Sequence, residues 1–283
     1  RRHTPRAAPL DNLARVSGPG RHLARRRAHG PRIVPLAGGL NRMALQRFDL
    51  AQVPATPWKN GGGATREIAC WPQGADMDHF DWRLSVATVA QSGPFSYFAG
   101  VDRVITLLTG DGMHLRRSRS QAQSHSHSHS PSPSPSPSPS PSPSPLQIET
   151  QPHVDQVLQP LTPFAFAGDD GVDCDVLRGA CTDFNLMTRR GRWQGRVQVL
   201  RGAALLPARP AGALLAVQGR WAVAPLAGEQ SPTVRAAVGV DGGMVLAPDT
   251  GLWWADESCG FTAAPVSADE GGAVLLHVVL ARA

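Results

Sequence analysis

Short runs of alternating apolar and polar residues, separated by glycine-rich turns, are the most constraining feature of this sequence. In the run HFDWRLSVATVA (79–90), large apolar side chains occupy every second position from Phe80 to Val86, and Arg83 and Ser85 lie between them. An extended chain places alternate residues on opposite faces, so this run predicts a strand with one buried face and one charged face.

Several further runs have the composition of strands, and glycine-containing turns such as 61–63, 110–112 and 241–243 separate them. No run has the apolar spacing of an amphipathic helix of 12 residues. We therefore expect an all-β chain built as a sandwich or a barrel. The expected strands are 64–71, 79–90, 102–110, 174–180, 183–189, 196–203, 213–223, 243–249, 251–256 and 273–283.

A low-complexity tract at 116–145 interrupts this pattern, with serine alternating first with histidine and then with proline. It offers no apolar side chains to bury, so we expect it to stay extended and solvated. The spacing of His125, His127 and His129 is compatible with metal chelation, as in an affinity tag. We favour a repeat expansion in a surface loop, because loops accept long insertions at a small cost in closure entropy.

The positive charge of the chain is concentrated at its beginning. The formal net charge is +6, but residues 1–42 contain ten arginines and a single acid, Asp11. That segment has nine surplus positive charges, so the other residues together have three more negative than positive charges. We interpret 1–42 as a disordered extension outside the native protein and Met43 as the true start; a basic arm or transit peptide is the alternative. A nucleic-acid partner is not expected.

Hydropathy and cysteine content indicate a cytoplasmic protein without a membrane partner. The longest apolar run, AVLLHVVLA (273–281), is far shorter than the roughly 20 residues that span a bilayer. The four cysteines, Cys70, Cys174, Cys181 and Cys259, have no CxxC spacing. In a chain of this length without a secretory signal, they are expected to be reduced thiols.

The first candidate ligand-binding segment is TPWKNGGGATREI (56–68). Three consecutive glycines allow positive φ angles or a close approach of the backbone to a ligand. Lys59 is the sole lysine of the chain, and every other side-chain cation is arginine. This suggests that position 59 requires a compact ammonium group rather than a planar guanidinium. A glycine-rich turn with an incidental surface lysine is the competing interpretation. The order of a phosphate-binding loop is missing.

Two further clusters contain candidate residues. In SGPFSYFAGVDRV (92–104), Phe95, Tyr97 and Phe98 are expected to pack in the core or at a barrel rim, and a substrate platform is the alternative. Solvation is the simple interpretation of Asp102 and Arg103. In DFNLM (183–187), alternation places Asp183, Asn185 and Met187 on one face. Asn185 in mid-strand is unfavourable unless its amide is used, in a ligand contact or in a structural hydrogen bond.

The series WKNGGGATREI, FDWRLSVATV, GPFSYFAGVDRVITLLTGDG, PFAFAGD and DFNLMTRRG, in this order, resembles the HutD/Ves family of bicupins. The resemblance is strong from Trp58 to Gly191 and weak beyond it. It implies an all-β double cupin of two stacked barrel or jelly-roll sandwiches. The expected division is an N-terminal barrel over 43–190, interrupted by 116–145, and a C-terminal cupin-like barrel over 191–283.

The resemblance also implies binding of an anionic histidine-degradation intermediate such as formylglutamate, and a regulatory role. A homodimer is considered as a possible assembly. Cationic and amide side chains suit such a ligand. We expect Arg66→Ala to weaken binding. The expected ligand-binding residues are Trp58, Lys59, Asn60, Arg66, Arg83, Phe95, Asn185 and Met187.

Neither a metal site nor a catalytic site is recognisable. Metal-dependent cupins use a His-x-His-x3,4-Glu stretch, and the corresponding region here offers His114 alone. No nucleophile elbow occurs, so no cofactor is expected. The alternative is a metal-independent cupin isomerase or hydrolase that uses Glu67 or His79 on a small carboxylic acid. Of Arg66 and Glu67, only one can face a pocket, because neighbouring strand residues point to opposite faces.

Overall fold

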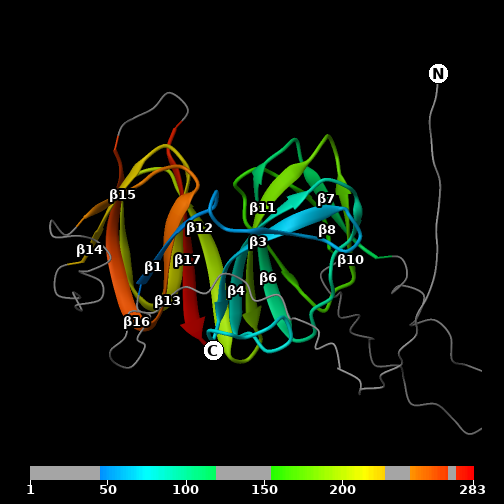
Figure 1. Cartoon of the computed structure of the whole chain (residues 1–283), viewed down its shortest axis with the longest axis horizontal. Helices are drawn as coiled ribbons and strands as arrows, with labels where there is room; N and C mark the ends of the chain where they lie inside the picture. The colour runs from blue at the N-terminus through cyan, green and yellow to red at the C-terminus, as the bar shows by residue number, and fades with distance from the viewer. Residues whose placement is uncertain (1–44, 119–153, 227–242, 267–271) are drawn as a thin grey trace, which may run out of the picture. The chain divides into compact units, whose positions relative to one another are not determined.

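The computed structural model of the chain describes residues 45–118, 154–226, 243–266 and 272–283, and β-strands are the regular structure throughout these residues (Figure 1). Every strand pairing in them is antiparallel. This confirms the all-β class. The described residues contain no helix long and apolar enough to cross a membrane.

Two sheets make up the N-terminal half. The six-stranded sheet has the order β2 (Ala55–Pro57), β3 (Gly63–Trp71), β4 (Trp82–Val89), β11 (Cys181–Arg189), β6 (Val101–Thr109) and β9 (Phe164–Ala167). The four-stranded sheet has the order β5 (Gly93–Pro94), β10 (Val172–Val176), β7 (Met113–Arg117) and β8 (Asp155–Leu158). Buried side chains such as Ile105, Leu107, Met113 and Leu115 pack between the two sheets, so this half is a β-sandwich.

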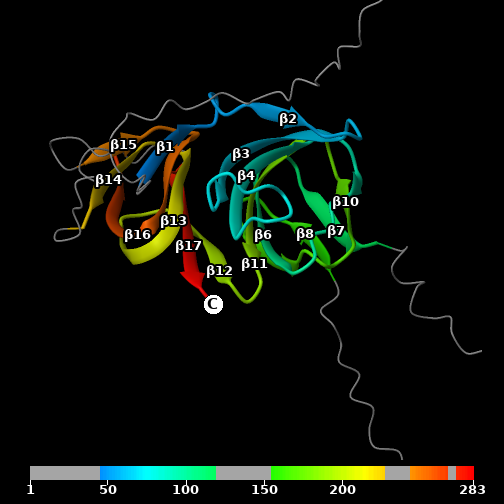
Figure 2. The same ribbon diagram turned by 60° about the horizontal axis from the view of Figure 1, so that its bottom comes forward.

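One seven-stranded sheet makes up the C-terminal half. Its order is β12 (Trp193–Leu200), β17 (Val274–Arg282), β13 (Ala204–Gln218), β16 (Thr250–Pro265), β14 (Trp221–Pro225) and β15 (Met244–Leu246), and β1 (Leu45–Asp49) pairs with β16. Register shifts interrupt the pairing of β13 with β16, and such bulges bend strands. The sheet curls around a core of its own that includes Trp221, Trp254 and Phe261 (Figures 1 and 2).

A third core, the shared core, joins the two halves. It contains Trp82 and Leu84 of β4 and Phe184 and Leu186 of β11, which pack with the C-terminal side chains Leu215, Leu276, Val278 and Leu280. The six-stranded sheet is therefore covered on both faces. The order of layers is the four-stranded sheet, the six-stranded sheet and the C-terminal sheet (Figure 2).

Burial of both faces corrects the expectation for the run at 79–90. The alternation was predicted correctly, but Arg83 and Ser85 are buried, with 9 and 2% of their surface exposed. The four-stranded sheet and the 94–98 segment cover most of the face that carries them, which is also the face on which a pocket forms. A charged residue on an alternating strand can thus belong to an internal polar site.

The boundaries and the placement of several elements differ from the sequence expectation. The run at 213–223 is two strands, β13 and β14, and β7 extends to Arg117, so Arg116 and Arg117 belong to a strand and not to the low-complexity tract. β1 lies in the C-terminal sheet, although 43–190 was expected to form one N-terminal barrel. The expected extension 1–42, the rest of the tract, and His125, His127 and His129 lie outside the described residues.

Candidate functional site

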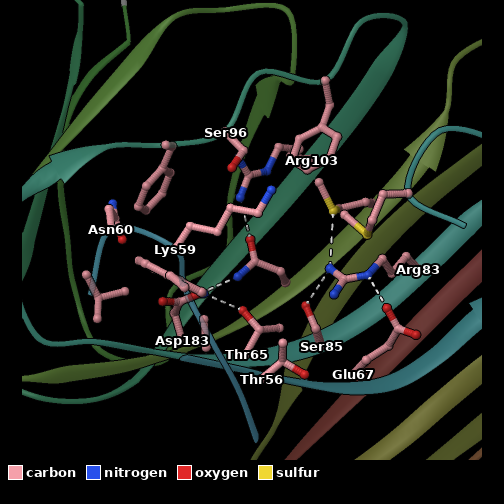
Figure 3. Close-up of a pocket in the computed structure, with 18 of the residues that line it drawn as sticks. Thr56, Lys59, Asn60, Thr65, Glu67, Arg83, Ser85, Ser96, Arg103 and Asp183 are labelled. Atoms are coloured by element: carbon pink, nitrogen blue, oxygen red, sulfur yellow. Dashed lines mark hydrogen bonds and ion pairs between the residues drawn. The ribbon is translucent and has the colours of Figure 1, made fainter. Parts of the chain in front are cut away.

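A pocket of about 710 Å³ opens in the N-terminal half, a volume within the range of small-molecule sites. Its base is the face of the six-stranded sheet that also carries the core of the sandwich. The segments 56–60 and 94–98 form its rim. The polar and sulfur-containing residues that line it are Thr56, Lys59, Asn60, Thr65, Glu67, Met77, Arg83, Ser85, Ser96, Arg103, Asp183, Asn185 and Met187 (Figure 3).

Arg83 on β4 is one of two buried arginines in the pocket, and Glu67 on β3 neutralises it. Arg83 Nε donates to Glu67 Oε2 at 2.7 Å, and Nη1 donates to Ser85 Oγ at 3.2 Å. The same Nη1 lies 3.8 Å from Met187 Sδ. These contacts fix the guanidinium in one orientation at the base of the pocket.

Arg103 on β6 is the second buried arginine, and it has no carboxylate within salt-bridge distance among the described residues. Its Nη2 donates to Asn185 Oδ1 at 2.9 Å, while its buried Nε has no hydrogen-bond partner. The rings of Phe95, Phe98 and Phe166 lie 4.9–5.8 Å from its guanidinium carbon. Burial lowers the pKa of Arg103 to about 10, so it remains a cation at neutral pH.

Asp183 on β11 is a carboxyl group at the base of the same pocket, with 1% of its surface exposed. Its Oδ1 accepts a hydrogen bond from Asn185 Nδ2, and its buried Oδ2 has no partner among the described residues. Burial raises its pKa to about 7, although the charge of Arg103 and the Asn185 hydrogen bond act in the opposite direction. Asn185 thus bridges a buried acid and a buried base, so it makes structural hydrogen bonds inside the pocket.

The rim is formed by the segment predicted from its consecutive glycines. Trp58 Nε1 donates to Thr65 Oγ1 at 2.8 Å, and Asn60 Oδ1 accepts from the Gly62 amide at 3.0 Å. Lys59 is solvent-exposed, and its side chain points into the pocket toward Arg103 (Figure 3).

The requirement for glycine at two of the three positions, 61 and 63, has a structural explanation that does not involve a ligand. Gly61 has a φ of +71°, which favours glycine. A Cβ on Gly63 would lie 2.2 Å from the Thr88 carbonyl oxygen and 3.0 Å from the Trp58 ring. The glycines therefore set the path of the rim segment, and Gly63 also leaves room for the indole of Trp58.

Seven of the eight residues expected to bind a ligand come together in this pocket, and Arg66 does not. Arg66 points away from it, and its Nη1 donates to the Val53 carbonyl at 2.5 Å. Glu67, the neighbour on the opposite face of β3, lines the pocket instead. The seven residues are Trp58, Lys59, Asn60, Arg83, Phe95, Asn185 and Met187.

Sequence reasoning missed Arg103, which was expected to be solvated. The signal was present, because Arg103 occurs in the same alternation phase as Val101, Ile105 and Leu107 on β6, and all four are buried. A charged residue in the inward phase of a strand indicates a polar site in the interior. The same phase argument on β11 identifies Asp183, which precedes Asn185 and Met187 on one face.

His79 and His114, which were considered for catalysis and metal binding, lie outside the pocket. Exposed His79 contacts Asp76 at 2.7 Å, and His114 Nε2 lies 2.6 Å from Asp155 Oδ1. Across the described ranges, no three His, Cys, Asp or Glu side chains are grouped so that they could hold a metal ion.

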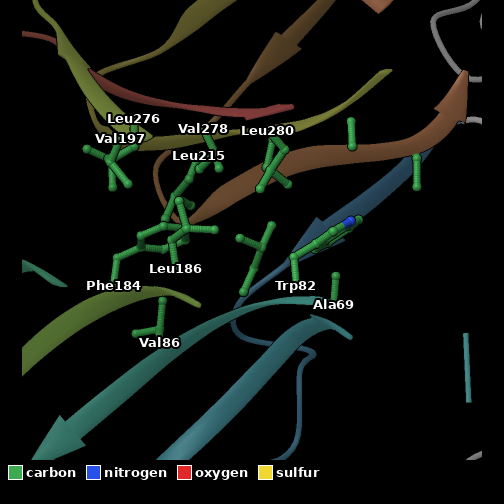
Figure 4. Packing of buried hydrophobic residues seen from close by; sticks show 14 of the residues in the cluster. Ala69, Trp82, Val86, Phe184, Leu186, Val197, Leu215, Leu276, Val278 and Leu280 are labelled. Atoms are coloured by element: carbon green, nitrogen blue, oxygen red, sulfur yellow. The ribbon is translucent and has the colours of Figure 1, made fainter. Parts of the chain in front are cut away.

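The pocket strands have a second role on their opposite face. Trp82, Val86, Phe184 and Leu186 alternate along β4 and β11 with the pocket residues and project into the shared core (Figure 4). The backbone that positions Arg83, Asp183 and Asn185 is therefore packed against the C-terminal sheet.

Comparison with known proteins gives one family. The model of the HutD family matches residues 50–133 and 145–275, which is most of the chain. An uncharacterized 21.2 kDa protein in the hutC 3′ region of Pseudomonas putida is 36% identical over 162 residues, which cover 57% of this chain and 67% of that protein. Protein Ves of Escherichia fergusonii is 29% identical over 213 residues, covering 75% of this chain and 84% of Ves.

Solved structures share this fold. A conserved protein of unknown function from Pseudomonas aeruginosa PAO1 has a TM-score of 0.60 at 27% identity. The match covers 83% of this chain and 98% of that protein. HutD from Pseudomonas fluorescens SBW25, in a formate condition, has a TM-score of 0.58 at 25% identity, covering 85% of this chain and all of its own. Oxalate decarboxylase from Lactobacillus farciminis has a TM-score of 0.50 at 7% identity. The match covers 86% of this chain and 87% of the decarboxylase chain. The fold class is thus the expected double cupin, built here from sandwiched and bent sheets.

Proposed function

The chain belongs to the HutD family, and we propose that its pocket binds a small anionic metabolite of the formylglutamate type. Such a ligand offers carboxylates for cations and a formamide group for hydrogen bonds. The names of a relative near hutC and of the HutD structure support a setting in histidine utilisation. In this proposal the protein senses or retains a degradation intermediate and thereby modulates the pathway.

The observation that carries the proposal is Arg103. A buried guanidinium without a carboxylate partner is costly unless something pairs with it, and Arg103 faces a cavity of ligand size. Arg83 is already paired with Glu67, so Arg103 and the rim residue Lys59 are the pocket cations without a salt-bridge partner among the described residues. A ligand carboxylate next to Arg103 Nε would also satisfy the donor that lacks a partner.

The remaining lining residues support a ligand with both charged and uncharged polar groups. Ser85, Ser96 and Thr65 offer hydroxyl groups, and Asn60 offers an amide at the rim. Phe95 and Phe98 enclose Arg103 from the side of the 94–98 segment. Apolar walls around a few polar groups exclude water and strengthen charge-assisted hydrogen bonds.

Calorimetric titration of the protein with N-formylglutamate tests the proposal. We expect saturable binding, weakened about 10-fold to 100-fold by Arg103→Gln, since a hydrogen bond to a charged group contributes about 1.5–3 kcal/mol. Because Arg103 is buried, thermal unfolding must show that the variant is folded. Lys59→Gln, at an exposed position, separately tests the positive charge that the rim contributes to the pocket.

Arg66→Ala is the matched control, because Arg66 is a cation on β3, adjacent to the pocket residue Glu67, whose side chain lies outside the pocket. Its affinity should equal that of the unmodified protein, contrary to the expectation from sequence alone. Absence of heat at millimolar ligand, or unchanged affinity in folded Arg103→Gln, would refute the proposal. Proton NMR of the ligand after incubation distinguishes binding from turnover.

A further inference from the structure

Asp183 is the one pocket carboxyl group that has no cationic partner within salt-bridge distance in the described structure; the other, Glu67, is paired with Arg83. The Asp183 Oδ2 atom is buried and makes no hydrogen bond within the part of the chain that the structure describes. Its Oδ1 is joined through the Asn185 amide to Arg103, so the acid, the amide and the guanidinium form one chain of hydrogen bonds.

We propose that Asp183 takes up one proton when the pocket binds its anionic ligand, and that Asp183 is therefore a neutral hydrogen-bond donor in the complex. This inference rests on the proposed function. The proton comes from solvent and is added to Oδ2, with no other bond made or broken. The hydroxyl formed there then donates either to the ligand or within the base of the pocket.

Charge balance in the pocket is the main argument. The charged and titratable groups around Asp183 are Arg103 from β6, Arg83 from β4, Glu67 from β3, Cys174 from β10 and Lys59 from the rim. The Arg83–Glu67 pair is neutral as a unit. An ionised Asp183 would cancel one of the two remaining positive charges and would repel an incoming carboxylate. Like charges close together in a buried site raise the pKa of one of them.

The unpartnered oxygen is the second argument. An ionised carboxylate needs several donors to be stable in a buried site, yet the described residues give Asp183 only the Asn185 amide. A protonated carboxyl has one donor and fewer acceptors to satisfy. The surroundings of Oδ2 therefore favour the protonated form once a ligand anion excludes water.

Asp183 titrates in a pH range in which proton uptake on ligand binding can be observed near neutral pH. Burial already raises its pKa to about 7 in the free protein. The pKa values of Arg103, about 10, and of Cys174, about 12, lie well above that range. No histidine is among the described residues that line the pocket. Because binding raises the pKa of Asp183 further, the ligand is bound more tightly below pH 7 than above it.

The test is calorimetric titration with N-formylglutamate at pH 8 in two buffers of different ionisation enthalpy, HEPES and Tris. The dependence of the heat on the buffer gives the number of protons taken up. We expect close to one proton per ligand at pH 8 and close to none at pH 5.5, where Asp183 is already protonated. The dissociation constant should rise by up to about tenfold per pH unit above pH 7.

Two variants separate Asp183 from other sources of protons. Asp183→Asn, a neutral side chain of the same shape, should still bind but without proton uptake and with little dependence on pH. Asp155→Asn removes an exposed carboxylate outside the pocket and should retain the full uptake. If Asp183→Asn does not fold, carbon-13 NMR of the Asp183 carboxyl in the unmodified protein at pH 8 decides: a protonated signal in the complex supports the inference, and an ionised signal overturns it.

The outcomes distinguish this inference from the proposed function. Binding with no buffer dependence at pH 8, or uptake that persists in Asp183→Asn, would overturn the role of Asp183 while leaving the ligand class intact. No binding at any pH from 5.5 to 8.5 would overturn the ligand class and this inference with it.

Discussion

His277 on β17 is a buried base whose titration affects stability in the direction opposite to that of Asp183. Only 2% of its surface is exposed, and its Nδ1 lies 3.0 Å from Gln198 Oε1. Burial, together with the charges of Arg196 and Arg209, lowers the pKa of His277 to about 4. The histidine is therefore neutral in the folded protein at neutral pH.

Replacing His277 with glutamine should make the protein less sensitive to acid. The unfolded chain binds a proton at His277 near pH 6.5, whereas the folded chain does so only near pH 4. Stability from His277 is thus complete above pH 6.5 and is lost as the pH falls toward 4, with a slope of at most about 1.4 kcal/mol per pH unit. Urea unfolding at pH 7, 6 and 5 measures it; equal slopes in the variant and the unmodified protein would contradict the prediction.

The pH dependence of the His277→Gln variant must be compared with that of the unmodified protein, because Asp183 contributes to the pH dependence of stability with the opposite sign. Its raised pKa means that the folded state binds more protons than the unfolded state between about pH 4 and 7. Its contribution to stability is complete below that interval and falls as the pH rises through it. A pH profile of the unmodified protein alone would show only the sum.

Individual site residues were predictable where alternation and composition agreed. Asn185 and Met187 face the pocket because they alternate with Phe184 and Leu186, a pattern visible in the sequence. The choice between Arg66 and Glu67 was not predictable, because small residues precede them on β3 and a bulge after Glu67 shifts the register. Which face of such a strand is internal is decided by its partner strands.

At the scale of elements, the rim segment depends on Gly63 at the start of β3. Gly63→Ala should lower the free energy of unfolding by about 1–3 kcal/mol, the usual cost of overpacking. A Cβ there conflicts with the Thr88 carbonyl and the Trp58 ring. We also expect weaker ligand binding, since Trp58 lines the pocket. Thermal unfolding and the same calorimetric titration measure the two effects.

Gly202→Ala is the control for Gly63→Ala. No atom lies within 4 Å of a Cβ built at Gly202, and its φ is not positive. This variant should leave stability unchanged or raise it slightly, because alanine restricts the unfolded chain. If both alanines had the same effect, the close packing at Gly63 would not be the cause.

Strand existence was easier to predict than strand partnership. The apolar alternation of 183–189 and 273–283 identified β11 and β17 almost to their ends. β13 and β16, with 15 and 16 residues, were predicted too short, because bulges and bends interrupt their periodicity. The pairing of β1 with β16 depends on contacts over more than 200 residues of sequence, about which local patterns contain no information.

At the scale of the whole described structure, the shared core couples the pocket to the C-terminal sheet. Leu275 and Leu276 are adjacent on β17 and completely buried, but Leu275 packs in the C-terminal core and Leu276 in the shared core. Each change to alanine should cost about 2–5 kcal/mol of stability. We expect only Leu276→Ala also to weaken ligand binding, because the shared core supports the backs of β4 and β11.

Stability and affinity measured on both leucine variants check this coupling. Urea unfolding gives the two stabilities, and calorimetric titration at a temperature where both variants are folded gives the affinities. Equal affinities would show that the pocket does not depend on the layer behind it. A loss of affinity in both variants would point to general loosening of the fold.

The position of β1 has a consequence for how the protein is made. β1 is synthesised before every other described strand, yet its partner strand β16 begins more than 200 residues later, at Thr250. On a translating ribosome the strands of the N-terminal sandwich can therefore pair before β1 has a partner strand. The C-terminal sheet can therefore be completed only after β16 has been synthesised, so β1 is without its partner strand during most of translation.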